Sequence, residues 1–203
     1  MSDLKYYAKR YYIITILLTL NIIVHVMQFF WGDAIYGLGC LDVINVIEQK
    51  QFYRIFTCNF IHADLSHLAG NMIFLVALGQ MLEDTIGHLK FCIVYLAAGI
   101  TGSVFSLMQS WLSGEYYLSV GASGAVFGLV GALLFMVIMN NGRFANISLS
   151  RILLAVVYIV YSGMRTPYID NAAHIGGIIG GVLFMMLIYI FGCVQKGRIN
   201  FEN

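Results

Sequence analysis

Apolar residues run through this chain in long unbroken stretches rather than in an alternating pattern. A helix that spans a bilayer needs about 20 mostly apolar residues, whereas membrane-embedded strands give short alternating segments. The continuous runs therefore predict transmembrane helices and argue against a membrane barrel. Six runs are candidate spans, at residues 11–31, 65–82, 89–109, 121–139, 149–163 and 172–193.

The first run has the flanks of a signal peptide but not its length. Lys5, Lys9 and Arg10 precede it, as a positively charged leader would require. The apolar stretch is longer than the core of a signal peptide, and no small-x-small cleavage site follows it. We interpret residues 11–31 as a retained first transmembrane helix.

Composition supports a membrane protein. The 203 residues are 60% hydrophobic and 10% charged, whereas a soluble domain carries about 25% charged residues. The net charge of +1 gives no reason to expect a nucleic-acid partner. The four cysteines form no CxxC pair, so we expect no disulfide framework. We expect one all-α domain over residues 1–203, built as a six-helix bundle.

Basic residues predict the orientation of the spans, because cytoplasmic loops are enriched in lysine and arginine. If the N-terminus is cytoplasmic, only three of the eleven basic residues lie outside, namely Lys50, Arg54 and Arg165. Both termini are therefore expected in the cytoplasm. The basic residues on the inner side would be Lys5, Lys9, Arg10, Lys90, Arg143, Arg151, Lys196 and Arg198.

One connection is much longer than the others. Residues 32–64 join the first two spans on the outer side and mix polar with apolar positions. Such a segment is typical of short amphipathic helices that fold against the membrane interface.

Polar side chains inside membrane helices are costly and mark candidate functional sites. In the predicted orientation, His67, Asn71, Ser123 and His174 all lie in the outer half of the bilayer, although they come from three different spans. His67 and Asn71 are four residues apart and so share one helix face. The convergence of these four side chains predicts a single site.

Glycines predict how two of these spans meet. Gly124 and Gly128 form a GxxxG pair after Ser123, and Gly177 and Gly181 form another after His174. Such faces let helix backbones approach closely. Packing the two faces together would bring Ser123 within reach of His174.

The chemistry of such a pair is nucleophilic catalysis. A serine hydroxyl is a weak nucleophile until a neighbouring base takes its proton, which is a role for His174. Ser123 lies at the start of a predicted helix, where the first N–H groups have no helical partner, and the Ser123 N–H, Asn71 and His67 could donate to an oxyanion. Asp170 and Asn171 are the nearest groups that could orient His174, and neither lies inside a span, so we expect a dyad.

These residues resemble the rhomboid family of intramembrane serine proteases. The matching motifs are Gly121-Ala-Ser-Gly-Ala125, Ala173-His-Ile-Gly-Gly177 and the series His62, His67 and Asn71, in the same order and on the expected spans. The resemblance implies a Ser123–His174 dyad in a cavity open to the outer face, with His67 and Asn71 at the oxyanion. It also implies lipid surroundings and substrates that are transmembrane segments of other proteins.

Other positions follow or depart from the family pattern. Tyr53-Arg54 resembles an aromatic–arginine pair of the first loop, and Glu83 matches an acidic residue expected to be structural. Phe127 stands where the family often has a tyrosine against the catalytic histidine, so we expect it to support His174 by packing alone. His62 is expected to have either a site role or a structural contact.

Several alternatives stay open at this stage. Ser123 could be a small residue at a helix crossing, and His67 and Asn71 could form interhelical hydrogen bonds. A metal site at His62, Asp64, His67 and His174 is the alternative from another class, but HExxH is absent, and we expect no metal or other cofactor.

A catalytically silent relative, acting as a membrane chaperone or trafficking factor, is the main rival function. A small transporter is disfavoured because no charged pair or broken helix interrupts the spans. We expect a multi-pass protein of a bacterial plasma membrane, and the sequence does not indicate an oligomeric state.

Overall fold

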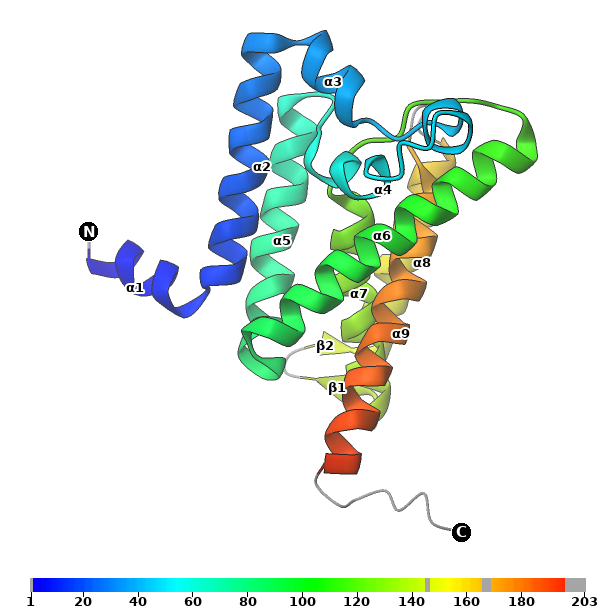
Figure 1. Ribbon diagram of the computed structural model, residues 1–203. Coiled ribbons are helices and arrows are strands. Elements are labelled where there is room, and N and C mark those ends of the chain that lie inside the picture. The colour runs from blue at the N-terminus through cyan, green and yellow to red at the C-terminus, as the bar shows by residue number, and fades with distance from the viewer. Residues whose placement is uncertain (1, 145–146, 166–168, 196–203) are drawn as a thin grey trace.

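The computed structural model describes residues 2–144, 147–165 and 169–195 (Figure 1). Lys196 and Arg198, two of the basic residues that predict the orientation, lie outside these ranges. Each of the six predicted runs contains a helix. These are α2 (Tyr12–Trp31), α5 (Leu65–Ile86), α6 (His88–Ser113), α7 (Ser123–Met139), α8 (Leu149–Arg165) and α9 (Asn171–Gln195).

The helix boundaries differ little from the predicted ones. α5 runs to Ile86 and α6 to Ser113, beyond the predicted ends at residues 82 and 109. α7 begins at Ser123 rather than at residue 121, because Gly121 has a φ of +122°, which a helix does not allow.

Four helices of the described chain are long and apolar enough to cross a membrane, over Tyr12–Trp31, Leu65–Ile86, His88–Ser113 and Asn171–Gly192. α7 is apolar but has only 17 residues, and most of its surface is buried among other helices. The largely helical, multi-span architecture is therefore confirmed. The count of six spans and the cytoplasmic termini stay predictions.

Two elements were not expected from the apolar pattern. Helix α1 (Ser2–Arg10) precedes the first span, and an antiparallel hairpin of β1 (Arg143–Phe144) and β2 (Ile147–Ser148) connects α7 to α8. This short hairpin departs from the helical pattern, but the described chain is mostly helical, as predicted. Asn141 and Gly142 have positive φ and turn the chain out of α7 into the first strand.

The long connection of residues 32–64, which was predicted on the outer side and is called the outer connection here, is folded, as predicted, into short helices. They are α3 (Asp33–Gly39), η1 (Ile44–Glu48), α4 (Arg54–Thr57) and η2 (Cys58–Phe60). Arg54 is only 4% exposed, and its guanidinium donates to the Gly37 and Cys40 carbonyl oxygens at 2.7 and 2.8 Å. A buried guanidinium needs such acceptors, so Arg54 fixes the fold of this connection.

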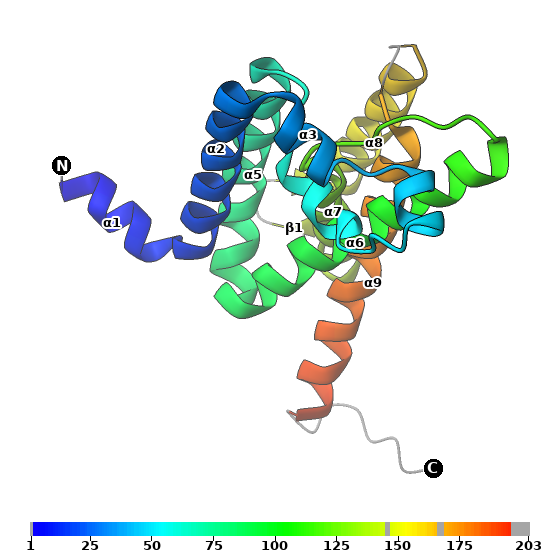
Figure 2. The same cartoon turned by 45° about the horizontal axis from the view of Figure 1, so that its top comes forward.

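Glycines determine the packing at the centre. A Cβ atom on Gly177 would overlap the carbonyl oxygen of Gly124, and one on Gly181 would overlap that of Gly128. The predicted packing of the two GxxxG faces is therefore confirmed for α7 and α9. α6 crosses the same pair of helices obliquely in both views (Figures 1 and 2).

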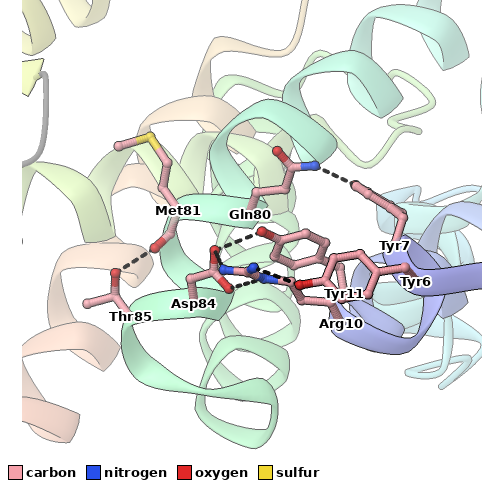
Figure 3. A network of polar contacts seen from close by, with 8 residues as sticks. All are labelled: Tyr6, Tyr7, Arg10, Tyr11, Gln80, Met81, Asp84 and Thr85. Atoms are coloured by element: carbon pink, nitrogen blue, oxygen red, sulfur yellow. Dashed lines mark hydrogen bonds and ion pairs between the residues drawn. The ribbon is translucent and has the colours of Figure 1, made fainter. Parts of the chain in front are cut away.

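A polar junction connects the end of α1 and the start of α2 to the last turns of α5, at the end of the bundle where α9 also ends (Figures 1 and 3). The Asp84 Oδ2 atom accepts hydrogen bonds from the Arg10 guanidinium at 3.1 Å and from the Tyr11 hydroxyl at 2.8 Å. Glu83, 2% exposed, accepts the backbone N–H of Ile13 at 3.2 Å and contacts His88 Nδ1 at 2.6 Å. Glu83 thus meets the positive end of the α2 dipole, which fits its expected structural role.

Candidate active site

Ser123 and His174 meet where α7 and α9 begin. The Nε2 atom of His174 lies 3.1 Å from the Oγ atom of Ser123, within hydrogen-bond distance. Both residues are half-buried. The contact is a consequence of the glycine packing, because the two backbones could not approach so closely with larger residues in their place.

The turn before Ser123 requires glycine for two reasons. Gly121 has a φ of +122°, which L side chains rarely adopt. A Cβ atom there would also lie 2.6 Å from the Cε1 atom of His67. The next residue, Ala122, has no side chain that can cap α7, so the first N–H groups of the helix remain free to donate to a ligand.

His67 and Asn71 lie against this turn, as their shared face on α5 predicted. The Asn71 Nδ2 atom would be 3.7 Å from a Cβ atom on Gly121. Asn71 is 7% exposed, and its Nδ2 atom is buried with no hydrogen-bond partner in the described chain. A buried donor without an acceptor is costly, which suggests that an acceptor arrives with a ligand.

His62 contacts the serine turn from the outer connection. Its side chain is fully buried, and Nε2 accepts the backbone N–H of Ala122 at 3.3 Å. Burial, with a smaller effect of His67, lowers the pKa of His62 to about 3, so the ring is neutral and can accept this bond. Its backbone is held by Gln28, whose amide oxygen and nitrogen lie 3.1 and 3.0 Å from the His62 N and O atoms.

Phe127 packs on His174, one helical turn after Ser123. The two ring centroids are 4.0 Å apart, with the planes tilted by 40°. This arrangement fixes one face of the imidazole without a hydrogen bond.

A small cavity lies beside Ser123, between α6 and the loop that leads to α7. The polar residues around the cavity include Cys58, Asn59, Ser103, Ser119 and Asp170. Burial raises the pKa of the Cys58 thiol to about 12, so Cys58 stays protonated and is a poor nucleophile.

Several buried polar groups of the bundle were not predicted from the sequence. Ser103, Ser106 and Ser110 are buried along one face of α6, at a spacing of three and four residues. A stripe of serines at helical spacing on an apolar span was the signal that could have revealed them.

The alternative of a metal site finds little support in this geometry. The Nε2 atoms of His62 and His174 already face Ala122 N and Ser123 Oγ. Within the described residues, no three His, Cys, Asp or Glu side chains are grouped to hold a metal ion.

The fold and this site define a class of protein: a multi-pass integral membrane protein in which a serine and a histidine from two helices meet. Residues 49–191 match the Rhomboid domain. The chain belongs to the rhomboid family.

The relatives come from plants and bacteria. RHOMBOID-like protein 7 of Arabidopsis thaliana is 37% identical over 78% of this chain and 50% of its own length. Rhomboid protease GluP of Bacillus subtilis is 38% identical over 68% of this chain and 26% of its own. YdcA, another rhomboid protein of that bacterium, is 32% identical over 82% of this chain and 77% of its own. The chain thus spans half or less of the length of RHOMBOID-like protein 7 and of GluP.

Proposed function

We propose that this protein is an intramembrane serine endopeptidase in which Ser123 is the nucleophile and His174 the general base. The observation that supports this proposal best is the 3.1 Å distance between Ser123 Oγ and His174 Nε2 at the start of two apolar helices. The name of GluP, a rhomboid protease, favours the same activity.

The reaction that fits this pair is acyl transfer. His174 Nε2 takes the hydroxyl proton as Ser123 Oγ bonds the carbonyl carbon, and the carbonyl electron pair moves to oxygen. The C–N bond then breaks, and His174 gives the proton to the leaving amine. Water attacks the acyl-enzyme by the same route, which releases the carboxylic acid and regenerates the serine hydroxyl.

The oxyanion of each tetrahedral intermediate needs donors. The His67 ring and Asn71 Nδ2 lie beside Gly121, and the Ser123 N–H is at the start of α7, two residues further on. The unpartnered Asn71 amide is the group best suited to the role. One such donor contributes a factor of about 10²–10³ to the rate in comparable sites.

The substrates we propose are transmembrane segments of other membrane proteins. The carbonyls of an intact helix are already hydrogen-bonded, so a segment must unwind before Ser123 can reach one. We further propose six spans within a single domain, with both termini in the cytoplasm and the site facing the outer side. The bacterial plasma membrane stays a prediction of the sequence, since the relatives include plant proteins.

Cleavage in liposomes tests the function. A purified transmembrane reporter, co-reconstituted with the wild type, is expected to be cut within its span, whereas Ser123→Ala leaves it intact. If the protein is a catalytically silent relative, neither the wild type nor Ser123→Ala will cut the reporter. Cleavage that continues with Ser123→Ala would reject the serine mechanism.

A further inference from the structure

Asp170, directly before α9, connects three parts of the site. Its Oδ1 atom accepts the Ala173 N–H at 2.9 Å, which caps the helix. Its Oδ2 atom accepts the hydroxyls of Ser106 in α6 and Ser119 in the loop before α7, each at 2.5 Å. A simple helix cap needs only the first of these bonds, so the other two indicate a further role for the carboxylate.

The Asp170 carboxylate lies at the start of the helix that carries His174 and beside the proposed nucleophile. The His174 N–H donates to the Asp170 carbonyl oxygen at 3.2 Å, and Asp170 and Ser123 line the same small cavity. Burial raises the pKa of Tyr117, and the charge of Asp170 acts in the same direction.

His174 lacks the partner that usually stabilises a catalytic histidine. Its Nδ1 atom is buried and has no hydrogen-bond partner in the described chain. When Nε2 takes the Ser123 proton, the ring becomes a cation in a poorly solvated site, which is costly without a counter-charge. Phe127 offers a ring face but no charge. Among the described residues that line the cavity beside Ser123, Asp170 is the one that carries a carboxylate.

We propose that Asp170 is a positioning residue whose carboxylate, held by Ser106 and Ser119, stabilises the imidazolium that forms on His174. The inference rests on the proposed function. The proton stays on His174 throughout the step, and Asp170 takes no part in its transfer. The charge acts through space rather than through the Nδ1 hydrogen bond of a triad.

The test separates the charge of Asp170 from its helix cap. Asparagine caps helices about as well as aspartate, and its oxygen can still accept the Ala173 N–H. Asp170→Asn is therefore expected to keep the thermal midpoint of unfolding and the KM for the reporter, while kcat falls about tenfold or more. If Asp170→Asn keeps the wild-type kcat while Asp170→Ala loses stability, Asp170 is only a cap.

A matched control is available in the outer connection. Asp42 is half-buried like Asp170, and its Oδ1 atom accepts the Asn45 N–H at 2.8 Å. Asp42→Asn removes one charge from a comparable cap and is expected to leave kcat unchanged. An equal loss of kcat in Asp42→Asn would mean that the effect of Asp170 is not specific.

Two further comparisons test the role of the Asp170 charge. If Asp170→Asn does not fold, Asp170→Glu and Asp170→Gln differ in charge at equal length, and kcat is expected to be higher for Glu. The rate of fluorophosphonate labelling at Ser123 is expected to fall with kcat in the neutral variants. A folded wild type that neither cleaves nor labels overturns the function and this inference together, whereas cleavage at equal rates by wild type and Asp170→Asn overturns the inference alone.

Discussion

The Nε2 atom of His174 lies 3.1 Å from the Oγ atom of Ser123, although 51 residues separate them in the chain. The contact depends on two glycine faces, because Gly177 and Gly181 pack directly on the carbonyl oxygens of Gly124 and Gly128. The proposed chemistry therefore depends on helix packing as much as on the two reacting side chains.

Gly181→Ala is expected to separate this pair. Its new Cβ atom would overlap the Gly128 carbonyl oxygen, so α9 must move away from α7. We expect the cleavage rate to fall about tenfold or more, because small displacements of reacting groups cost rates of this order, and the thermal midpoint of unfolding to drop. Gly192→Ala, on the same helix with nothing within 4 Å of the new Cβ, is the control and should match the wild type. Equal activity in both variants would contradict the packing argument.

Gly121→Ala tests the serine turn. The substitution forces a Cβ atom to within 2.6 Å of His67 and strains a backbone with φ of +122°, so loss of cleavage is expected. Gly114→Ala is the matched variant, because Gly114 also has a positive φ, of +70°, but no atom lies within 4 Å of its new Cβ. If both variants lose activity equally, backbone strain alone explains the effect and the contact with His67 is irrelevant.

Asn71→Ala tests the proposed oxyanion donor. Removing the amide is expected to lower kcat by about 10²–10³ and to leave the protein folded. Because Asn71 Nδ2 has no partner in the described chain, the thermal midpoint should not fall by the amount that a lost interhelical hydrogen bond would cause. Full activity with reduced stability would instead assign Asn71 to interhelical bonding.

His62 makes stability depend on pH. Its pKa is about 3 in the fold and about 6.5 in an unfolded chain, so between these values the unfolded chain binds a proton that the folded one does not. The stability of the wild type is therefore expected to fall as pH drops from 6.5 toward 3, by up to about 1.4 kcal/mol per pH unit from this residue. Thermal unfolding of His62→Gln between pH 7 and 4.5 should show a weaker pH dependence. Parallel curves for the two proteins would contradict the assignment.

Much of the fold was predictable because each long apolar run and each GxxxG pair lies within a single helix and can be recognised from neighbouring residues. Helix α1 and the β1–β2 hairpin were not, since α1 is polar and strands of two residues have no period to detect. The meeting of Ser123 and His174 was predictable from their depth and their glycines.

The surroundings of the pair were harder to predict. The bonds of Asp170 to Ser106 and Ser119 join residues 64 and 51 positions apart, and no local pattern encodes them. The unpartnered Nδ2 atom of Asn71 likewise depends on which groups the neighbouring helices leave out of reach. Such features depend on tertiary packing, which one sequence does not specify by periodicity.

The most direct test of the central claim is labelling by a serine-reactive fluorophosphonate in detergent. The wild type is expected to label at Ser123, whereas Ser123→Ala and His174→Ala should not, since the two residues act as one unit. Ser110→Ala, which removes a buried serine of α6, is the control and should label like the wild type. Labelling that persists in folded Ser123→Ala or His174→Ala, or a folded wild type that does not label, would contradict an activated Ser123–His174 pair.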